Sequence, residues 1–337
     1  MTVNQTLAQV SDLAFQAAAA AYLTALICHA AQLAARQTPQ PPASQVPARL
    51  ATTPTVGGPA APAAIGLLPR RDPVPWPERF ARAAVLVTTI GLAAQLLSIL
   101  TRGLAVQRAP WGNMYEFASM ITAAATATWL FVLTRNRVRS IGVFVLLPIV
   151  VLVFVAGTVL YVPASSLVPA LQTYWLVIHV LAISVATGML MLSGVASGLY
   201  LLRTRTRPSR TADGGHDGAD ATRERRGPLT ALPPPDTLDR IAYRTAIVAF
   251  PIYTFAVLAG AMWAEAAWGR YWGWDPKETT AFITWIIYAG YLHARATAGW
   301  RGRRAAWIPL LGLAAILFNL FFVNMVVSGL HSYAGLN

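Results

Sequence analysis

A short segment near the C-terminal end of this sequence is unusually rich in tryptophan. Four tryptophans and a tyrosine fall between residues 263 and 274, at Trp263, Trp268, Tyr271, Trp272 and Trp274. Such a density of rings, with glycines between them, favours contact with a large planar ligand. The competing interpretation is that the rings only anchor the chain at a membrane interface, where Trp and Tyr gather in most membrane proteins.

Histidine is the second residue type with potential chemistry. The chain has five, at His29, His179, His216, His293 and His331. His216 falls in a polar segment, and the other four lie in or beside apolar stretches, where an ionisable side chain is costly and therefore a functional candidate. A lone histidine in a span is also often only hydrogen-bonded to a neighbouring helix. His179 and His331 are expected at the depth of the tryptophan segment, an arrangement that fits haem with an imidazole on each side of iron.

The charged residues of the segment have two interpretations. Asp275, Pro276 and Glu278 occupy the N-cap, N1 and N3 positions of a typical helix start, which gives both carboxylates a structural role. Lys277, the only lysine in the chain, and Arg270 lie beside the rings and are expected to pair with carboxylates such as haem propionates.

The same helix start places a second candidate site. His293 follows Asp275 by 18 residues, or about 27 Å along a helix axis. It is therefore expected at the opposite end of its helix from the tryptophan segment. His29 is expected at a similar depth near the end of the first apolar stretch.

The composition predicts a membrane protein. Hydrophobic residues make up 56% and charged residues 12% of the chain, with a mean hydropathy of +0.51, whereas soluble domains carry about 25% charged residues. We predict an all-α polytopic helix bundle with about eight transmembrane helices, because that many apolar stretches can span roughly 30 Å of hydrocarbon. They run near 11–35, 82–101, 114–134, 141–161, 172–202, 241–263, 277–296 and 305–329.

Charge placement predicts the topology. The net charge is +13, and nearly all of the arginines lie in loops that flank alternate spans. The positive-inside rule puts those loops in the cytoplasm of a plasma-membrane protein and puts both termini and the tryptophan segment outside. This pattern indicates contact with membrane lipid and excludes nucleic acid as the expected partner. Cys28 is the single cysteine, so an internal disulfide framework and a CxxC pair are also excluded.

Composition divides the chain into five parts. We expect an N-terminal transmembrane helix over 1–36, a Pro/Ala-rich cytoplasmic linker over 37–81 and transmembrane helices two to five over 82–202. A disordered cytoplasmic loop is expected over 203–240, and helices six to eight over 241–337, with the tryptophan-rich ligand segment at 263–278. The sequence has no Gly-rich phosphate loop and no G-x-S-x-G motif, which argues against nucleotide-driven transport and serine chemistry.

The sequence resembles a known family over roughly residues 82–337, apart from the 203–237 loop. Trp268–Glu278 resembles the tryptophan-rich "WWD" signature of haem-handling proteins, and within that group the CcsA/ResC subunits of System II cytochrome c synthases. Asn113–Glu116, Trp175–Val180 and Ser328–Tyr333 resemble family segments, of which the last two carry the external histidines, and His293 matches the family's transmembrane histidine.

The resemblance implies a function. Haem b would be carried from the cytoplasmic side, at His293, to an external site with His179 and His331 as axial ligands. There it would be presented to the Cys-x-x-Cys-His motif of apocytochrome c for thioether attachment, so that the complex acts as a holocytochrome c synthase. A ResB/CcsB-type membrane partner would supply the second transmembrane histidine, unless His29 serves, and a thiol-reducing protein would prepare the apocytochrome.

Two alternatives belong to other functional classes. One is an exporter of haem or another planar aromatic compound without ligase activity. The other is a structural subunit whose tryptophans only anchor it in the membrane.

Overall fold

The chain folds as a bundle of helices. The computed structural model describes residues 3–37, 75–136, 138–165, 171–205, 232–297, 299–327 and 329, and no strand occurs within these ranges. The helices are α1 (Gln5–Gln37), α2 (Trp76–Val106), α3 (Met114–Arg135), α4 (Gly142–Thr158), α5 (Tyr174–Arg205), α6 (Pro235–Trp268), α7 (Pro276–Ala296) and α8 (Arg303–Leu317). A 3-10 turn, η1 (Arg139–Ile141), precedes α4, and a π-helical segment, η5 (Phe318–Val323), extends α8. The all-α class predicted from the sequence is confirmed.

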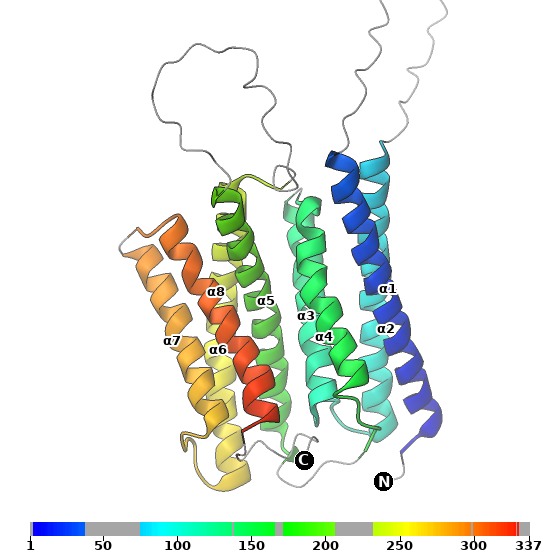
Figure 1. Cartoon of the computed structure of the whole chain (residues 1–337). Helices are drawn as coiled ribbons and strands as arrows, with labels where there is room; N and C mark the ends of the chain where they lie inside the picture. The colour runs from blue at the N-terminus through cyan, green and yellow to red at the C-terminus, as the bar shows by residue number, and fades with distance from the viewer. Residues whose placement is uncertain are drawn as a thin grey trace, which may run out of the picture.

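Seven segments in the described part of the chain are long and apolar enough to cross a membrane. They are α1, α2, α3, η1 with α4, α5, α6, and α8 with η5. The remaining predicted span, 277–296, is also a helix, α7, of 21 residues, but it carries too many polar side chains to belong to this set. In Figure 1, α7 runs beside α6 and α8 along the same axis. Packing against these neighbours therefore holds α7 in the bundle.

Helix α5 is central to the packing. It contacts α3, α6 and α8, while α1 and α2 pack along each other at one edge of the bundle and α7 lies at the opposite edge (Figure 1). Gly188 allows the close approach of α5 to α3, because a Cβ there would lie 2.6 Å from the backbone nitrogen of Ala125. Small residues at helix contacts are typical of membrane bundles, in which backbones must approach closely.

Buried polar side chains also join helices in the membrane interior. Tyr22 on α1 donates a hydrogen bond to Gln95 Oε1 on α2 at 2.6 Å, and the Gln95 amide donates to Thr122 Oγ1 on α3 at 2.7 Å. All three side chains are buried. Such hydrogen bonds are a usual source of specificity between membrane helices.

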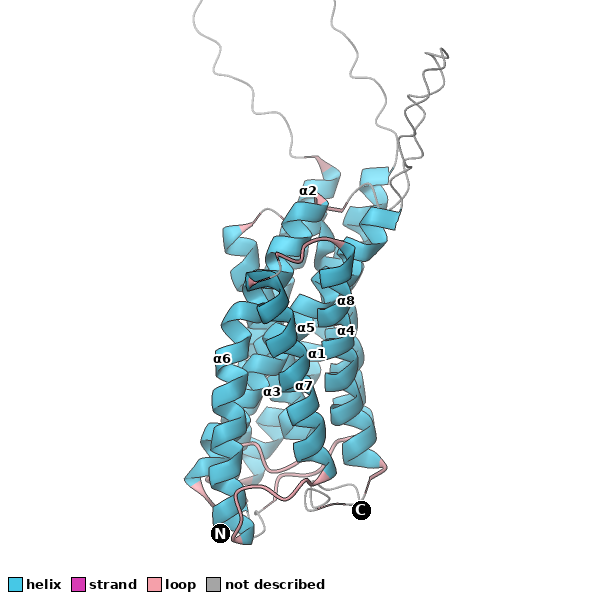
Figure 2. Cartoon of the chain, turned by 90° about the vertical axis from the view of Figure 1, so that its left-hand side faces the viewer, coloured by secondary structure: helices cyan, strands magenta, loops and turns pink. Residues whose placement is uncertain are grey.

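The two ends of the bundle differ in composition. The α2–α3, α4–α5 and α6–α7 connections and the start of α1 lie at one end, called here the tryptophan end because the α6–α7 connection contains Trp272 and Trp274 (Figure 1). The α3–α4 and α7–α8 connections lie at the other, the arginine end, with Arg135, Arg139, Arg301 and Arg303. Figure 2 shows that the helices stay nearly parallel between these ends. The described arginine-rich connections, which the sequence places between alternate spans, thus lie together at one end of the bundle.

Candidate functional site

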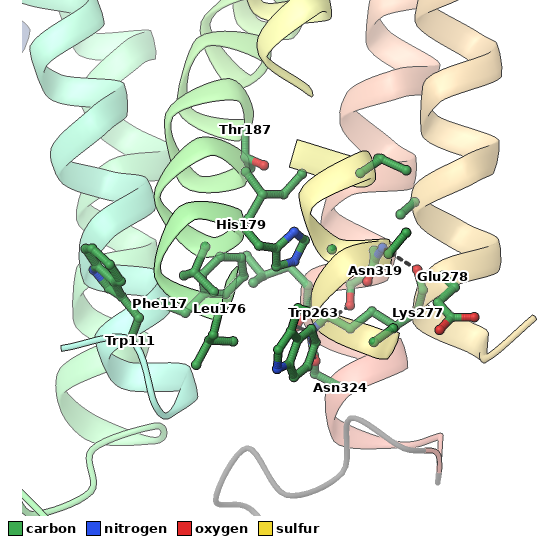
Figure 3. Close-up of a pocket in the computed structure, with 18 of the residues that line it drawn as sticks. Trp111, Phe117, Leu176, His179, Thr187, Trp263, Lys277, Glu278, Asn319 and Asn324 are labelled. Atoms are coloured by element: carbon green, nitrogen blue, oxygen red, sulfur yellow. Dashed lines mark hydrogen bonds between the residues drawn. The ribbon is translucent and has the colours of Figure 1, made fainter. Parts of the chain in front are cut away.

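A cavity opens at the tryptophan end between α3, α5, α6, α7 and α8. It encloses about 1270 Å³, including the space at its mouth. Figure 3 shows side chains from these helices converging on it. Its wall is mostly apolar and aromatic, as ligand cavities usually are, and its principal residues are Trp111, Phe117, Leu176, His179, Thr187, Tyr253, Trp263, Trp268, Tyr271, Trp272, Lys277, Glu278, Asn319 and Asn324.

Among the residues that the structure describes, His179 is the histidine in this wall. It lies on α5, and its Nδ1 is 2.7 Å from the backbone oxygen of Ala256 on α6. A carbonyl oxygen only accepts hydrogen bonds, so Nδ1 carries the proton and donates it. The imidazole lone pair is therefore on Nε2, the arrangement typical of a histidine ligand whose other nitrogen is fixed by a backbone carbonyl. His179 is thus held in a tautomer that can bind a metal through Nε2.

Tryptophan side chains surround His179. Trp263 on α6 is buried, and its ring stacks on the His179 ring with centroids 6.0 Å apart and planes inclined by 17°. Trp268 lies against Trp263 at 4.9 Å. Trp111 and Trp272 complete the aromatic wall, and the indole nitrogens of both are buried without a hydrogen-bond partner among the described residues. This wall fits a flat apolar ligand that carries acceptor groups at its edge.

The α6–α7 connection is fixed by caps. Gly269 ends α6 in the left-handed region with φ +68°, and its N–H donates to the Glu265 carbonyl. Asp275 is the N-cap of α7 and Glu278 closes a capping box, as the sequence predicted. Between them, Trp274 has φ +58°, which is strained for a bulky residue.

The Glu278 carboxylate holds this connection in place. Its Oε2 accepts hydrogen bonds from the backbone N–H groups of Gly273 at 2.9 Å and Asp275 at 3.1 Å. The same carboxylate oxygen lies 3.8 Å from Arg270 Nη1, and the Arg270 guanidinium rests on Gly273, where it would overlap an added Cβ. Arg270 is therefore engaged with its own loop and lies outside the cavity wall.

Lys277, in contrast, faces the cavity. Its ammonium donates to Asn324 Oδ1 and lies 5.7 Å from the centre of the Phe117 ring. Asn319 donates to the Lys277 carbonyl at 3.3 Å, and Asn319 belongs to the π-helical segment η5. Single π turns within α-helices occur frequently at functional sites. Lys277 is therefore the cation of the wall, with Asn324 bonded to its ammonium and Asn319 to its backbone carbonyl, and Glu278 is a carboxylate in the same wall.

Trp111 is placed by a buried ion cluster beside the cavity. The carboxylate of Glu116 binds Arg102 Nε at 2.7 Å, Arg108 Nη1 at 3.0 Å and the backbone N–H of Gly112 at 2.7 Å. The Glu116 and Arg102 side chains are almost fully buried. This cluster fixes the α2–α3 connection, which brings Trp111 into the wall.

The predicted site residues fall into three groups. His179, Trp263, Trp268, Tyr271, Trp272 and Lys277 are brought together in the cavity wall. Trp274, which is 65% exposed, Arg270 and Asp275 lie outside it. His331 lies outside the described residues, but Gly329 approaches Asp275, because a Cβ on Gly329 would be 2.7 Å from Asp275 Oδ2.

The two histidines expected near the arginine end are far apart in the bundle. His293 is exposed on α7, whereas His29 is buried on α1, bonded to Gln32 and packed on Gly142 of α4. Helices α1 and α7 lie at opposite edges (Figure 1). The chain therefore does not bring His29 and His293 together as a ligand pair.

Asn319, Asn324 and Trp111 are among the wall residues that were not identified from the sequence. Asn319 and Asn324 are amides within an otherwise apolar span, which is a recognisable signal because polar groups are costly there. Trp111 precedes the Asn113–Glu116 segment, and its contribution depends on a loop conformation that no local pattern indicates.

Comparisons with known proteins show the family of this chain. The family model described as Cytochrome C assembly protein matches residues 111–331, a range that includes every principal wall residue. The chain is similar to the cytochrome c biogenesis protein CcsA of Guillardia theta, with 34% identity over 235 residues, covering 68% of this chain and 77% of the relative. It is also similar to CcsA of Gloeobacter violaceus, with 31% identity over 309 residues, covering 78% and 91% respectively. This multi-pass membrane protein therefore belongs to the cytochrome c assembly family and is of the CcsA type.

Proposed function

We propose that this protein is the haem-handling subunit of a cytochrome c synthase and that haem b is the substrate of the cavity. The observation that carries the proposal is His179, whose Nε2 lone pair is assigned by the Ala256 carbonyl within a wall of tryptophans. Histidine is a common axial ligand of haem iron, and flat aromatic side chains suit the faces of the macrocycle.

His331 is the proposed second axial ligand. Gly329 passes beside Asp275 at the start of α7. Two protein imidazoles would hold haem in one orientation until the histidine of the cytochrome replaces one of them.

The proposed reaction joins two cysteines of apocytochrome c to haem. In each addition the cysteine sulfur bonds to one carbon of a vinyl group and the thiol hydrogen is transferred to the other, so that no external oxidant or reductant is consumed in that step. The protein contributes position: His179 and the tryptophans orient the vinyl groups, and Lys277 pairs with a propionate.

The inner part of the route involves His293. Its exposure on α7, at the edge of the bundle, suits a haem ligand shared with a neighbouring membrane protein. We propose a ResB/CcsB-type partner as the source of the second histidine, a thiol-reducing protein for the apocytochrome, and a plasma-membrane location with the tryptophan end outside.

Covalent haem attachment tests this function. The full chain is co-expressed with a ResB/CcsB-type partner and an apocytochrome c that carries Cys-x-x-Cys-His, and covalent haem is quantified on denaturing gels. We expect His179→Ala to lower the yield of holocytochrome at least about ten-fold, because even the loss of a group that only orients a metal ligand costs about 10–100-fold. Tyr174→Ala is the control, because Tyr174 is exposed on the same helix. Equal yields from wild type and His179→Ala would contradict the proposal.

A further inference from the structure

The His179 ring is seated on one face of α6. The Ala256 carbonyl accepts from Nδ1 at 2.7 Å, Gly260 follows one turn later, and Trp263 stacks on the ring one turn beyond that. Positions 256, 260 and 263 have the i, i+4, i+7 spacing that places residues on one side of a helix. Three consecutive turns of α6 therefore contact a single imidazole.

Of these three positions, Gly260 is the one at which an added side chain would disturb the contact with His179. A Cβ on Gly260 would lie 2.7 Å from both Cε1 and Nδ1 of His179. Real Cβ atoms essentially never approach other atoms closer than 3.0 Å, so the ring would have to move away from α6. That movement would lengthen or break the Nδ1 hydrogen bond and turn the Nε2 direction.

We propose that Gly260 is a positioning residue for His179: its missing side chain lets α6 set both the tautomer and the direction of the metal-binding nitrogen. This inference rests on the proposed role of His179 as a haem ligand. Mutation of a group that orients a ligating histidine typically lowers metal affinity by about 10–100-fold. Gly260 also lines the cavity, and its proposed effect is transmitted through the His179 ring.

The test compares four forms of the full chain, purified from cells supplied with haem: wild type, Gly260→Ala, His179→Ala and the double variant. Haem content and the fraction of six-coordinate, low-spin iron are measured by absorption and electron paramagnetic resonance. Gly290→Ala on α7 is the matched control, because a Cβ there meets nothing within 4 Å. The control is expected to match wild type.

We expect Gly260→Ala to lower haem content, because the haem affinity falls about ten-fold or more, and to convert low-spin iron to a high-spin form. In the His179→Ala background the same substitution is expected to change neither quantity, since the ring on which it acts is absent. A wild-type spectrum for Gly260→Ala, or an equal shift in both backgrounds, would overturn the proposal. If His179→Ala itself left the spectrum unchanged, the proposed function would fail instead.

Folding yield gives a second measure if Gly260→Ala is unstable. Removing the ring makes room for the added Cβ, so the double variant is expected to recover the yield and thermal stability that Gly260→Ala loses. A double variant as unstable as Gly260→Ala would show that the Cβ meets something other than His179, and would overturn the proposal.

Discussion

At the residue scale, the two cations of the tryptophan segment have different roles. Lys277 lies in the cavity wall with its ammonium on Asn324, while Arg270 folds onto Gly273 and approaches Glu278. Two cations that are close in the sequence therefore differ in whether they can pair with an anionic group of a ligand once the chain is folded. Only Lys277 is placed to meet a carboxylate inside the cavity.

Substitution of the two cations tests this difference. We expect Lys277→Met to weaken haem binding about ten-fold, because a hydrogen bond to a charged group contributes about 1.5–3 kcal/mol, and to weaken binding of haem dimethyl ester much less. Arg270→Met is the control, and its haem affinity should stay within about two- to three-fold of wild type. Titration of purified protein with the two haems gives the affinities. A larger loss for Arg270→Met than for Lys277→Met would contradict the assignment.

At this scale, local contacts are predictable from the sequence and contacts between distant segments are not. The capping box at Asp275 and Glu278 is local, so its prediction was confirmed. Trp274 lies outside the wall, and its own backbone is in the left-handed region. Residue types alone do not determine that conformation. Trp111 was missed because a cluster around Glu116, assembled from α2 and α3, brings it to the cavity.

At the element scale, α7 combines a polar composition with a defined start. Its first turn anchors the α6–α7 connection through Glu278, and its last turn carries His293. The predicted helices were found close to their expected positions, but several are longer. Helix α6 begins at Pro235 rather than near 241, and α2 at Trp76 rather than near 82, because proline and charged residues are tolerated in a first turn that projects from the apolar core.

Releasing the carboxylate that holds the connection should disturb the site without unfolding the bundle. We expect Glu278→Ala to destabilise the start of α7 by about 0.5–2 kcal/mol, the usual cost of losing a helix cap, and to weaken haem binding. Limited proteolysis should show faster cleavage within residues 269–275, and the melting temperature of the whole protein should change little. Glu265→Ala on exposed α6 surface is the control. Unchanged cleavage and haem affinity for Glu278→Ala would contradict this role.

At the scale of the whole molecule, the two ends of the bundle differ. The cavity and the tryptophans occupy one end, and the described arginine-rich connections occupy the other (Figure 1). Charge alternation along the sequence was sufficient to predict this separation. It could not predict that α5 is central or that α1 and α7 lie at opposite edges, because neighbours in a membrane bundle are chosen by packing of small and polar residues over long sequence separations.

The orientation of the bundle is testable by labelling in intact cells. In a Cys28→Ser background, cysteines are placed at Trp274, exposed at the tryptophan end, and at Thr297, exposed at the arginine end. We expect a membrane-impermeant maleimide to label the first position in intact cells and the second only after the membrane is permeabilised, because arginine-rich connections stay in the cytoplasm. The reverse pattern would contradict the proposed orientation.

The most direct measurement is the absorption spectrum of the purified full chain with and without the His179 imidazole. Wild type is expected to carry haem with the Soret band of a six-coordinate, low-spin haem b. His179→Gly should lose that band or convert it to a high-spin form, and added free imidazole, which fits the space left by the ring, should restore it. A His179→Gly protein that binds as much haem as wild type, with the same spectrum and no response to imidazole, would contradict the assignment of this cavity as the haem site.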